Sequence, residues 1–125
     1  MIQQTKRADS RYFTQIELRE TISNNTKYDP NAQREERETY RYQTGATYTG
    51  QWIGGFRDGY GKQVWPDGAC YEGNWKDNRA QGIGKFTHID GDIYEGNWVN
   101  DKANGRGVYI HVNGARYEGQ WMDDL

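Results

Sequence analysis

The chain repeats a short motif at a fixed spacing of 23 residues, and this period restricts its fold more than any other feature. The motif begins with Tyr, has Gly at its third position and ends with Trp. Its copies begin at positions 48, 71, 94 and 117 of the 125 residues, with no insertion between them. A period of roughly 20 to 50 residues is typical of arrays in which each unit packs on its neighbours. The aromatic residues of the motif are Tyr48, Trp52, Tyr71, Trp75, Tyr94, Trp98, Tyr117 and Trp121.

Glycine follows the same period. All 16 glycines lie between positions 45 and 119, and most occupy fixed places in the unit: before the Tyr, inside the motif and in a G-x-G pair after the Trp. A glycine weakens a strand, so glycines at fixed places need a packing reason. We expect flat rings from neighbouring strands to lie on them. These glycines are Gly45, Gly50, Gly59, Gly61, Gly68, Gly73, Gly82, Gly84, Gly91, Gly96, Gly105, Gly107, Gly114 and Gly119.

Each unit is predicted to be a β-hairpin. Residues 46–53 place Tyr, Gly and Trp on one face and polar residues on the other, as a half-buried strand does. Turn-forming residues at 54–58 interrupt this strand, and a second strand is expected from about 60 to 65. The connections to later units contain Asp90-Gly91 and Asn113-Gly114, pairs that are favoured in tight hairpin turns. The units therefore stack as consecutive hairpins of one sheet.

The combination of Tyr-x-Gly-x-Trp, G-x-G and a turn ending in Gly, within 23 residues, resembles the MORN (membrane occupation and recognition nexus) repeat. The likeness covers residues 39–125, and Glu36 and Glu38 stand where the first unit would have its G-x-G pair. The predicted fold class is all-β, an elongated single-layer antiparallel sheet of stacked hairpin repeats with a non-repeat N-terminal extension. Its parts are a half unit at 39–45, units beginning at 46, 69 and 92, and an incomplete unit beginning at 115.

Residues 1–38 form the extension, which contains no glycine. Asp29 and Pro30 are suited to the cap and first turn of a helix, so a short helix is predicted over 30–38. The extension is interpreted either as a disordered tail or as a docking segment that folds back on the sheet or lies along another protein. Its apolar residues fit a helix and a strand equally well; they are Tyr12, Phe13, Ile16, Leu18 and Ile22.

The aromatic residues form either the core or a groove that binds a partner protein. Repeated large rings usually pack together, and the face of a single-layer sheet can also bind a helix or an extended segment. Positions that vary between units are better candidates for specificity. The predicted groove therefore combines the motif's aromatic residues with residues at two variable places. These residues are Trp65, His88 and His111 at one place, and Phe86 and Tyr109 at the other, where the first unit has Gln63.

No catalytic, metal or cofactor site is predicted. His88 and His111 occupy equivalent places in successive units, about 10 Å apart, which is too far for both to bind one zinc ion. Cys70 is the only cysteine, so the chain cannot form an internal disulfide. Each G-x-G pair leads into another strand, whereas a phosphate-binding loop leads into a helix. We therefore expect neither an enzyme nor a small-molecule substrate.

Charge and hydropathy narrow the choice of partner. The formal net charge of −2 gives no electrostatic footprint for nucleic acid. No stretch approaches the ~18 apolar residues of a membrane-spanning helix. Two short basic ladders, Lys62 with Lys85 and Arg79 with Lys102, are candidate contacts for anionic lipid, at about 1 kcal/mol per basic residue. A peripheral membrane module and a regulatory fragment of a larger MORN-containing enzyme remain the alternative interpretations.

The resemblance implies a scaffold or adaptor that binds other proteins of a large assembly. Short proteins made mostly of MORN repeats are similar to components of ciliary or flagellar axonemes and of other cytoskeletal structures. The expected location is therefore intracellular, in a cilium, flagellum or cytoskeleton, and otherwise cytoplasmic. Binding is expected in the aromatic groove and at open edge strands. Residues 117–125, which have no second strand after them, are the expected open edge.

Overall fold

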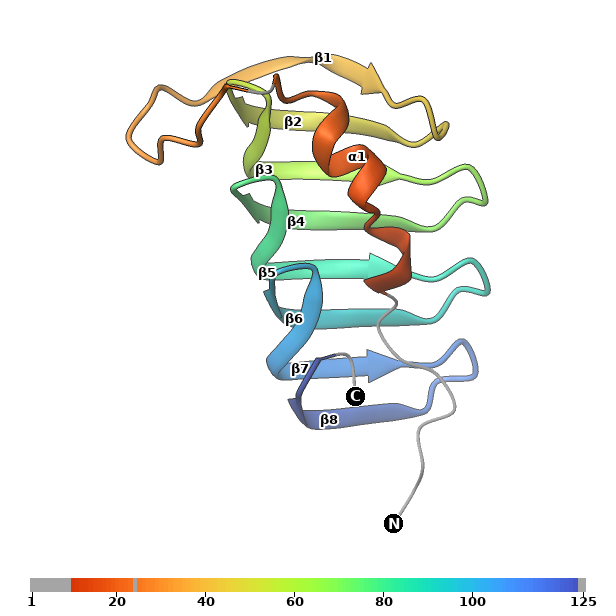
Figure 1. The fold of residues 1–125 in the computed structure, drawn as a ribbon. Coiled ribbons are helices and arrows are strands. Elements are labelled where there is room, and N and C mark those ends of the chain that lie inside the picture. The colour runs from red at the N-terminus through yellow and green to blue at the C-terminus, as the bar shows by residue number, and fades with distance from the viewer. Residues whose placement is uncertain (1–9, 24, 124–125) are drawn as a thin grey trace.

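A computed structural model describes residues 10–23 and 25–123 of the chain. Within this part, eight strands form one open antiparallel sheet in which each strand pairs with its sequence neighbours (Figure 1). This confirms the predicted all-β single sheet. The strands are β1 (Glu35–Arg41), β2 (Thr47–Ile53), β3 (Phe56–Val64), β4 (Cys70–Lys76), β5 (Arg79–Thr87), β6 (Ile93–Val99), β7 (Lys102–Ile110) and β8 (Arg116–Trp121).

The tight turns lie inside the units, and the Asp-Gly and Asn-Gly pairs lie between them. β4 and β5 are joined by Asp77 and Asn78, whose positive φ angles of 51° and 69° suit a two-residue hairpin turn. The second strand of each unit therefore begins earlier than predicted, at Phe56 in the first unit. The connections with Asp-Gly or Asn-Gly are longer loops, closed by bonds such as Gly68 N–H to Trp65 C=O at 2.9 Å.

Residues 35–41 form a strand, so the helix predicted over 30–38 is wrong. β1 pairs with β2 from Glu35 opposite Trp52 to Arg41 opposite Thr47. The physical reason is that this charged segment has no apolar face to hold a helix, whereas β2 offers it a row of unpaired backbone groups. The segment therefore supplies the second strand of the leading half unit despite the absence of a G-x-G pair, with a register shift between Arg37 and Tyr40.

Glycine lets each Tyr ring lie flat on the neighbouring strand. A Cβ on Gly84 would lie only 2.1 Å from the hydroxyl oxygen of Tyr71, and one on Gly73 only 2.4 Å from the Cα of Gly84. The Tyr71 hydroxyl donates a hydrogen bond to Asn74 C=O at 2.9 Å, and the Trp98 indole N–H donates to Gly84 C=O at 3.1 Å. The core is therefore a row of aromatic rings on a glycine stripe, and the same packing recurs in the next unit.

The sheet bends at the same place in each unit. The pairing of β4 with β5 shifts register between Gly73 and Trp75, and β2–β3 and β6–β7 shift at the equivalent places. Gly82 lies in the bulged strand with φ of +100°, a conformation that residues with a Cβ rarely adopt. The bend makes one face concave, and helix α1 (Gln15–Glu20) lies across this face (Figure 1).

Candidate functional site

The structure brings the predicted groove residues together on the concave face. The Tyr and Trp rings of the first three motifs are at most 2% exposed, so they form the hydrophobic core of this face. Trp65, Phe86, Tyr109 and Trp121 are also buried, and the remaining three predicted residues are half-buried at its margin. These three are His88, His111 and Tyr117.

Residues 10–22 of the chain itself lie in this groove, and we call them the strap. The strap consists of a short 3-10 helix (Ser10–Tyr12), Phe13, the capping residue Thr14, helix α1 and the two residues after it. Thr14 caps α1 by accepting a hydrogen bond from the Glu17 N–H at 3.4 Å. The strap therefore covers the strands of the first units. For residues 10–22, of the two interpretations of the extension, the structure agrees with a docking segment that folds back on the sheet. The disordered-tail interpretation of residues 1–9 falls outside the described residues.

Two aromatic residues of the strap insert among the rings of the sheet. The Phe13 ring lies 5.1 Å from Trp65, 5.7 Å from Tyr71 and 5.9 Å from Trp98, measured between ring centroids in edge-to-face geometry. The Tyr12 ring lies 5.1 Å from Trp65, and its hydroxyl donates a hydrogen bond to Asp67. Phe13 therefore acts as the central anchor, because it touches rings from successive units.

A buried polar chain holds the helix of the strap. Glu17 is 1% exposed, and its carboxylate accepts hydrogen bonds from the Gln63 side chain at 2.8 Å and from the Thr44 hydroxyl. Arg57 donates to Gln63 and, at 2.6 Å, to the Asn78 side chain, which in turn donates to Leu18 C=O at 2.8 Å. The buried side chains of Glu17, Arg57, Gln63 and Asn78 thus hydrogen-bond to one another or to the helix backbone, as the cost of burying them requires.

Arg57 is buried together with aromatic rings. Its guanidinium lies 4.5 Å from the ring centroid of Trp75 and 5.4 Å from that of Tyr42, within cation–π distance. Burial raises the pKa of the Tyr42 hydroxyl to about 12, although the charge of Arg57 opposes this shift. Burial also raises the pKa of Tyr48 and Tyr71 well above the usual value. These three hydroxyls are therefore neutral at physiological pH. Those of Tyr48 and Tyr71 donate to backbone carbonyls, whereas that of Tyr42 has no hydrogen-bond partner among the described residues.

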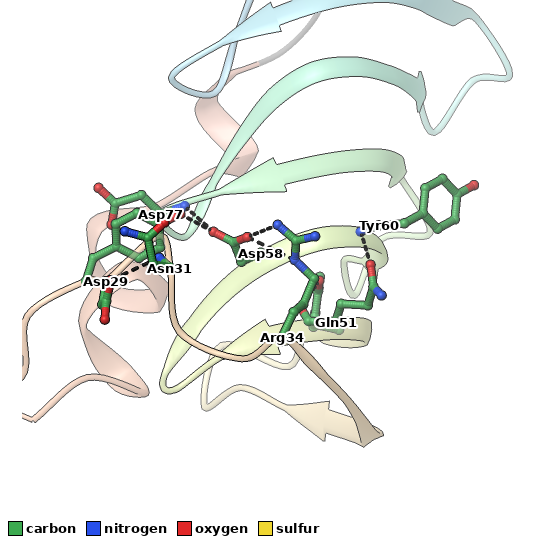
Figure 2. A network of polar contacts seen from close by, with 9 residues as sticks. Asp29, Asn31, Arg34, Gln51, Asp58, Tyr60 and Asp77 are labelled. Atoms are coloured by element: carbon green, nitrogen blue, oxygen red, sulfur yellow. Dashed lines mark hydrogen bonds and ion pairs between the residues drawn. The ribbon is translucent and has the colours of Figure 1, made fainter.

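A second polar network ties the segment between the strap and β1 to the sheet (Figure 2). The buried carboxylate of Asp58 accepts hydrogen bonds from the Tyr28 hydroxyl, from Arg34 at 2.6 Å and from the Asp77 backbone N–H at 3.1 Å. Burial alone would raise the pKa of Asp58, but these hydrogen bonds and the Arg34 charge lower it below its ordinary value. Asp58 is therefore an ionised anchor for residues 28–34.

Three residues that hold the strap are departures from the 23-residue pattern, and sequence analysis did not identify their role. Gly55 stands where later units have Asn78 and Asp101, and a Cβ there would lie 1.8 Å from the Thr21 carbonyl oxygen of the strap. The fact that only the first unit differs at these places could have indicated a special role for it. No feature of the sequence, however, connected these residues with residues 10–22. The other two are Arg57, where later units have Ala80 and Ala103, and Gln63, where they have Phe86 and Tyr109.

The two histidines each lie beside an aspartate. His111 Nδ1 is 3.0 Å from the carboxylate of Asp92, which also accepts a hydrogen bond from the Tyr109 hydroxyl at 3.2 Å. His88 Nδ1 is 3.2 Å from the Asp90 carboxylate. Among the described residues, no group of three or more His, Cys, Asp and Glu side chains is placed to hold a metal ion.

The candidate lipid contacts Lys62 and Lys85 lie on the opposite, convex face and alternate with acidic residues. Lys62 is opposite Glu72 on β4, which is opposite Lys85 on β5, which is opposite Glu95 on β6. The row therefore alternates in sign. The other pair lies beside the tight turns, where Arg79 is 3.9 Å from Asp101 and Lys102 begins β7. No helix of the described residues is long and apolar enough to cross a membrane.

The fold and the groove define a hairpin-repeat protein: an open sheet of stacked units whose concave face is lined by aromatic rings that pack against the rings of neighbouring units. The family model for the MORN repeat matches residues 48–70, 71–93, 94–116 and 117–125, which is more than half of the chain. The chain therefore belongs to the MORN repeat family. A search of curated proteins finds no match. MORN repeats point to a module that binds membranes or proteins, in a family that is typically non-catalytic.

Proposed function

We propose that this protein is a non-enzymatic scaffold or adaptor that binds partner proteins through the concave aromatic groove. The observation that supports this proposal is the strap: the groove holds a short helical peptide by ring insertion around Phe13 and by hydrogen bonds to Glu17. A surface that accepts such a segment from its own chain has the chemistry to accept one from another protein.

Protein is favoured over anionic lipid because of the charge pattern on the convex face. An anionic membrane attracts clustered basic residues, each contributing about 1 kcal/mol near the surface. Lys62 and Lys85 are separated by Glu72, so the attraction of each Lys is largely cancelled by its neighbour. Membrane binding and a regulatory role within a longer enzyme are the competing functions.

Edge strands are the second part of the proposed binding mode. β1 and β8 are the outer strands of the described sheet. The charged sequence and register shift of β1 protect it against pairing, whereas β8 pairs with β7 without a register shift. We propose that β8 adds a strand from another protein. Deletion of residues 117–125 should then weaken assembly with the partner, and unchanged assembly after deletion would contradict this part.

Site-specific photo-crosslinking in cells tests the groove directly. The full chain carries p-benzoylphenylalanine in place of Tyr117, a half-buried ring of the groove, or in place of Ile83, which is 55% exposed on the convex face. We expect a protein adduct from position 117 and none of the same mass from position 83. An identical adduct from both positions would count against groove binding.

The identity of the adduct tests the proposed setting. We propose a ciliary, axonemal or other cytoskeletal assembly, which predicts that mass spectrometry of the adduct identifies a protein of such a structure. Co-sedimentation with anionic vesicles that falls with salt and with Lys85→Glu, without any groove adduct, would support the membrane alternative. A transcript that joins these repeats to a catalytic domain would support the enzyme alternative.

A further inference from the structure

We infer that the part of the groove beneath the strap is a receptor for a helical segment that carries an aromatic residue followed four positions later by Glu, and that the strap is its intramolecular ligand. A partner segment of this chemistry then docks only when the strap leaves. This inference rests on the proposed function, because it names the kind of segment that the groove binds and identifies the strap as the segment that blocks the groove.

The first argument is that the strap binds as a ligand does. Phe13 is a single anchor in a cage of rings, and Tyr12 packs beside it on Trp65 and Phe86, at 5.1 and 5.4 Å between ring centroids. Aromatic anchors seated among packed rings are the usual hot spots of protein interfaces. The strap pairs with none of the eight strands of the described sheet, so these strands keep their hydrogen bonds when it leaves.

The second argument is the buried carboxylate of Glu17. An apolar side chain at this position would cover the core at lower cost, because a buried carboxylate must be fully hydrogen-bonded to be tolerated. The sheet supplies Gln63, positioned by Arg57, and the loop after β1 supplies the Thr44 hydroxyl. This arrangement gives selectivity for an acid four residues after the anchor, since an apolar residue would leave both donors without an acceptor and Gln would offer a single acceptor oxygen to the two donors.

The third argument is that the first unit is specialised for this segment. Gly55 has no side chain and so leaves room for the Thr21 backbone. The Thr21 hydroxyl donates a hydrogen bond to Gly55 C=O at 2.7 Å, and the Asn78 side chain donates one to Leu18 C=O. Arg57 replaces the Ala of later units at the same place in the pattern. A chain that needed only a covered core would not require these polar substitutions.

The attachment of the strap permits its release. Residues 25–34 lie between the strap and β1 and are mostly exposed, and Tyr28 and Arg34 fix this segment on Asp58. Release of residues 10–22 therefore leaves this anchor intact. While the strap is bound, the apparent affinity for a partner segment is reduced by the fraction of molecules in which the groove is open.

The test measures binding of a fluorescent peptide with the sequence of residues 10–22 to the full chain by anisotropy. The Phe13→Ala chain should bind this peptide at least ten times more tightly than the wild-type chain, because its own strap competes poorly. The Ile16→Ala chain is the matched control, since Ile16 is 64% exposed on the same strap, and it should bind like wild type. Peptides with Phe13→Ala or Glu17→Gln should bind at least ten times more weakly than the native peptide.

Equal and undetectable binding to the wild-type and Phe13→Ala chains, with cooperative unfolding of both, would overturn the inference. If the Phe13→Ala chain does not fold, Glu17→Gln in the full chain takes its place with the same expectation. Wild-type hydrogen exchange gives a second measurement: the amides of α1 should exchange at least ten times faster than those of β4, and equal protection would overturn the inference. Peptide binding without a groove adduct would contradict only the proposed function, and an adduct without peptide binding would contradict only this inference.

Discussion

Substitution of Gly73 by Ala should destabilise the protein strongly, whereas Ala at Gly119 should not. The two glycines hold the same place in the motif, on β4 inside the sheet and on the outer strand β8. A Cβ on Gly73 would lie 2.4 Å from the Cα of Gly84 and 2.6 Å from the carbonyl oxygen of Ile83. A Cβ on Gly119 would meet no described heavy atom within 4 Å.

The magnitude follows from the nature of the contact. The Gly73 Cβ would be about 1 Å short of ordinary carbon–carbon contact, and both obstructing atoms are backbone atoms of β5, so no rotamer change relieves the clash. Overpacking of this kind costs about 3 kcal/mol, the upper end of the usual range. For a chain of this size the cost lowers the midpoint of thermal unfolding by about 10 °C. The Gly119→Ala change should stay within about 0.5 kcal/mol of wild type.

Chemical unfolding followed by tryptophan fluorescence measures both variants, because the Trp residues of the repeats are buried in the core. The free energy of unfolding and its dependence on denaturant are compared at one pH. Equal destabilisation by Gly73→Ala and Gly119→Ala would refute the packing argument. The loss of stability would then follow from replacing Gly by Ala at any position, independent of the neighbouring backbone. A tolerated Gly73→Ala would refute the close approach of β4 and β5 at this point.

Three further predictions concern a hydrogen bond, a buried acid and the convex face. Trp98→Phe should cost about 1 kcal/mol more than Trp52→Phe, because the Trp98 indole bonds to Gly84 C=O whereas that of Trp52 has no acceptor among the described residues; urea unfolding measures the difference. Asp58→Asn should cost about 1–3 kcal/mol at pH 7, and the gap from wild type should narrow below about pH 4, because a lowered carboxyl pKa stabilises only while the group is ionised; unfolding at pH 7, 5 and 3 tests this, and a constant gap would contradict it. Lys62→Glu should leave co-sedimentation with anionic vesicles unchanged, since Glu72 already offsets this Lys, and a marked fall would revive the lipid interpretation.

The repeating part of the fold was predictable because its information is local and periodic. Two-residue alternation around Tyr48 and Trp52 indicates a strand, and the same spacing recurs in each unit. The resulting sheet buries these rings as its core. The turns were less predictable, because Asp-Gly pairs occur both in tight hairpins and in the longer loops found here, such as the loop that contains Gly68.

The extension was less predictable because its structure depends on contacts distant in sequence. Residues 35–41 are extended because β2 lies beside them, although Pro30 suggested the start of a helix. Phe13 is ordered by rings from β4, β5 and β6, and Glu17 by Gln63, which is 46 residues away. Local secondary-structure propensities depend only on the residues of the segment itself, so they do not include these long-range contacts.

The bulge that recurs beside Trp52, Trp75 and Trp98 has a consequence for arrays of other lengths. Because the bend is produced inside every hairpin, at Gly50, Gly73 and Gly96, the cross-section of the groove is a property of the unit and stays the same when units are added. Each added unit contributes two strands and thus lengthens the groove by about 10 Å. Repeat number therefore acts as a ruler: it sets how many turns of a bound helix the protein covers, while the fixed curvature sets how wide that helix can be.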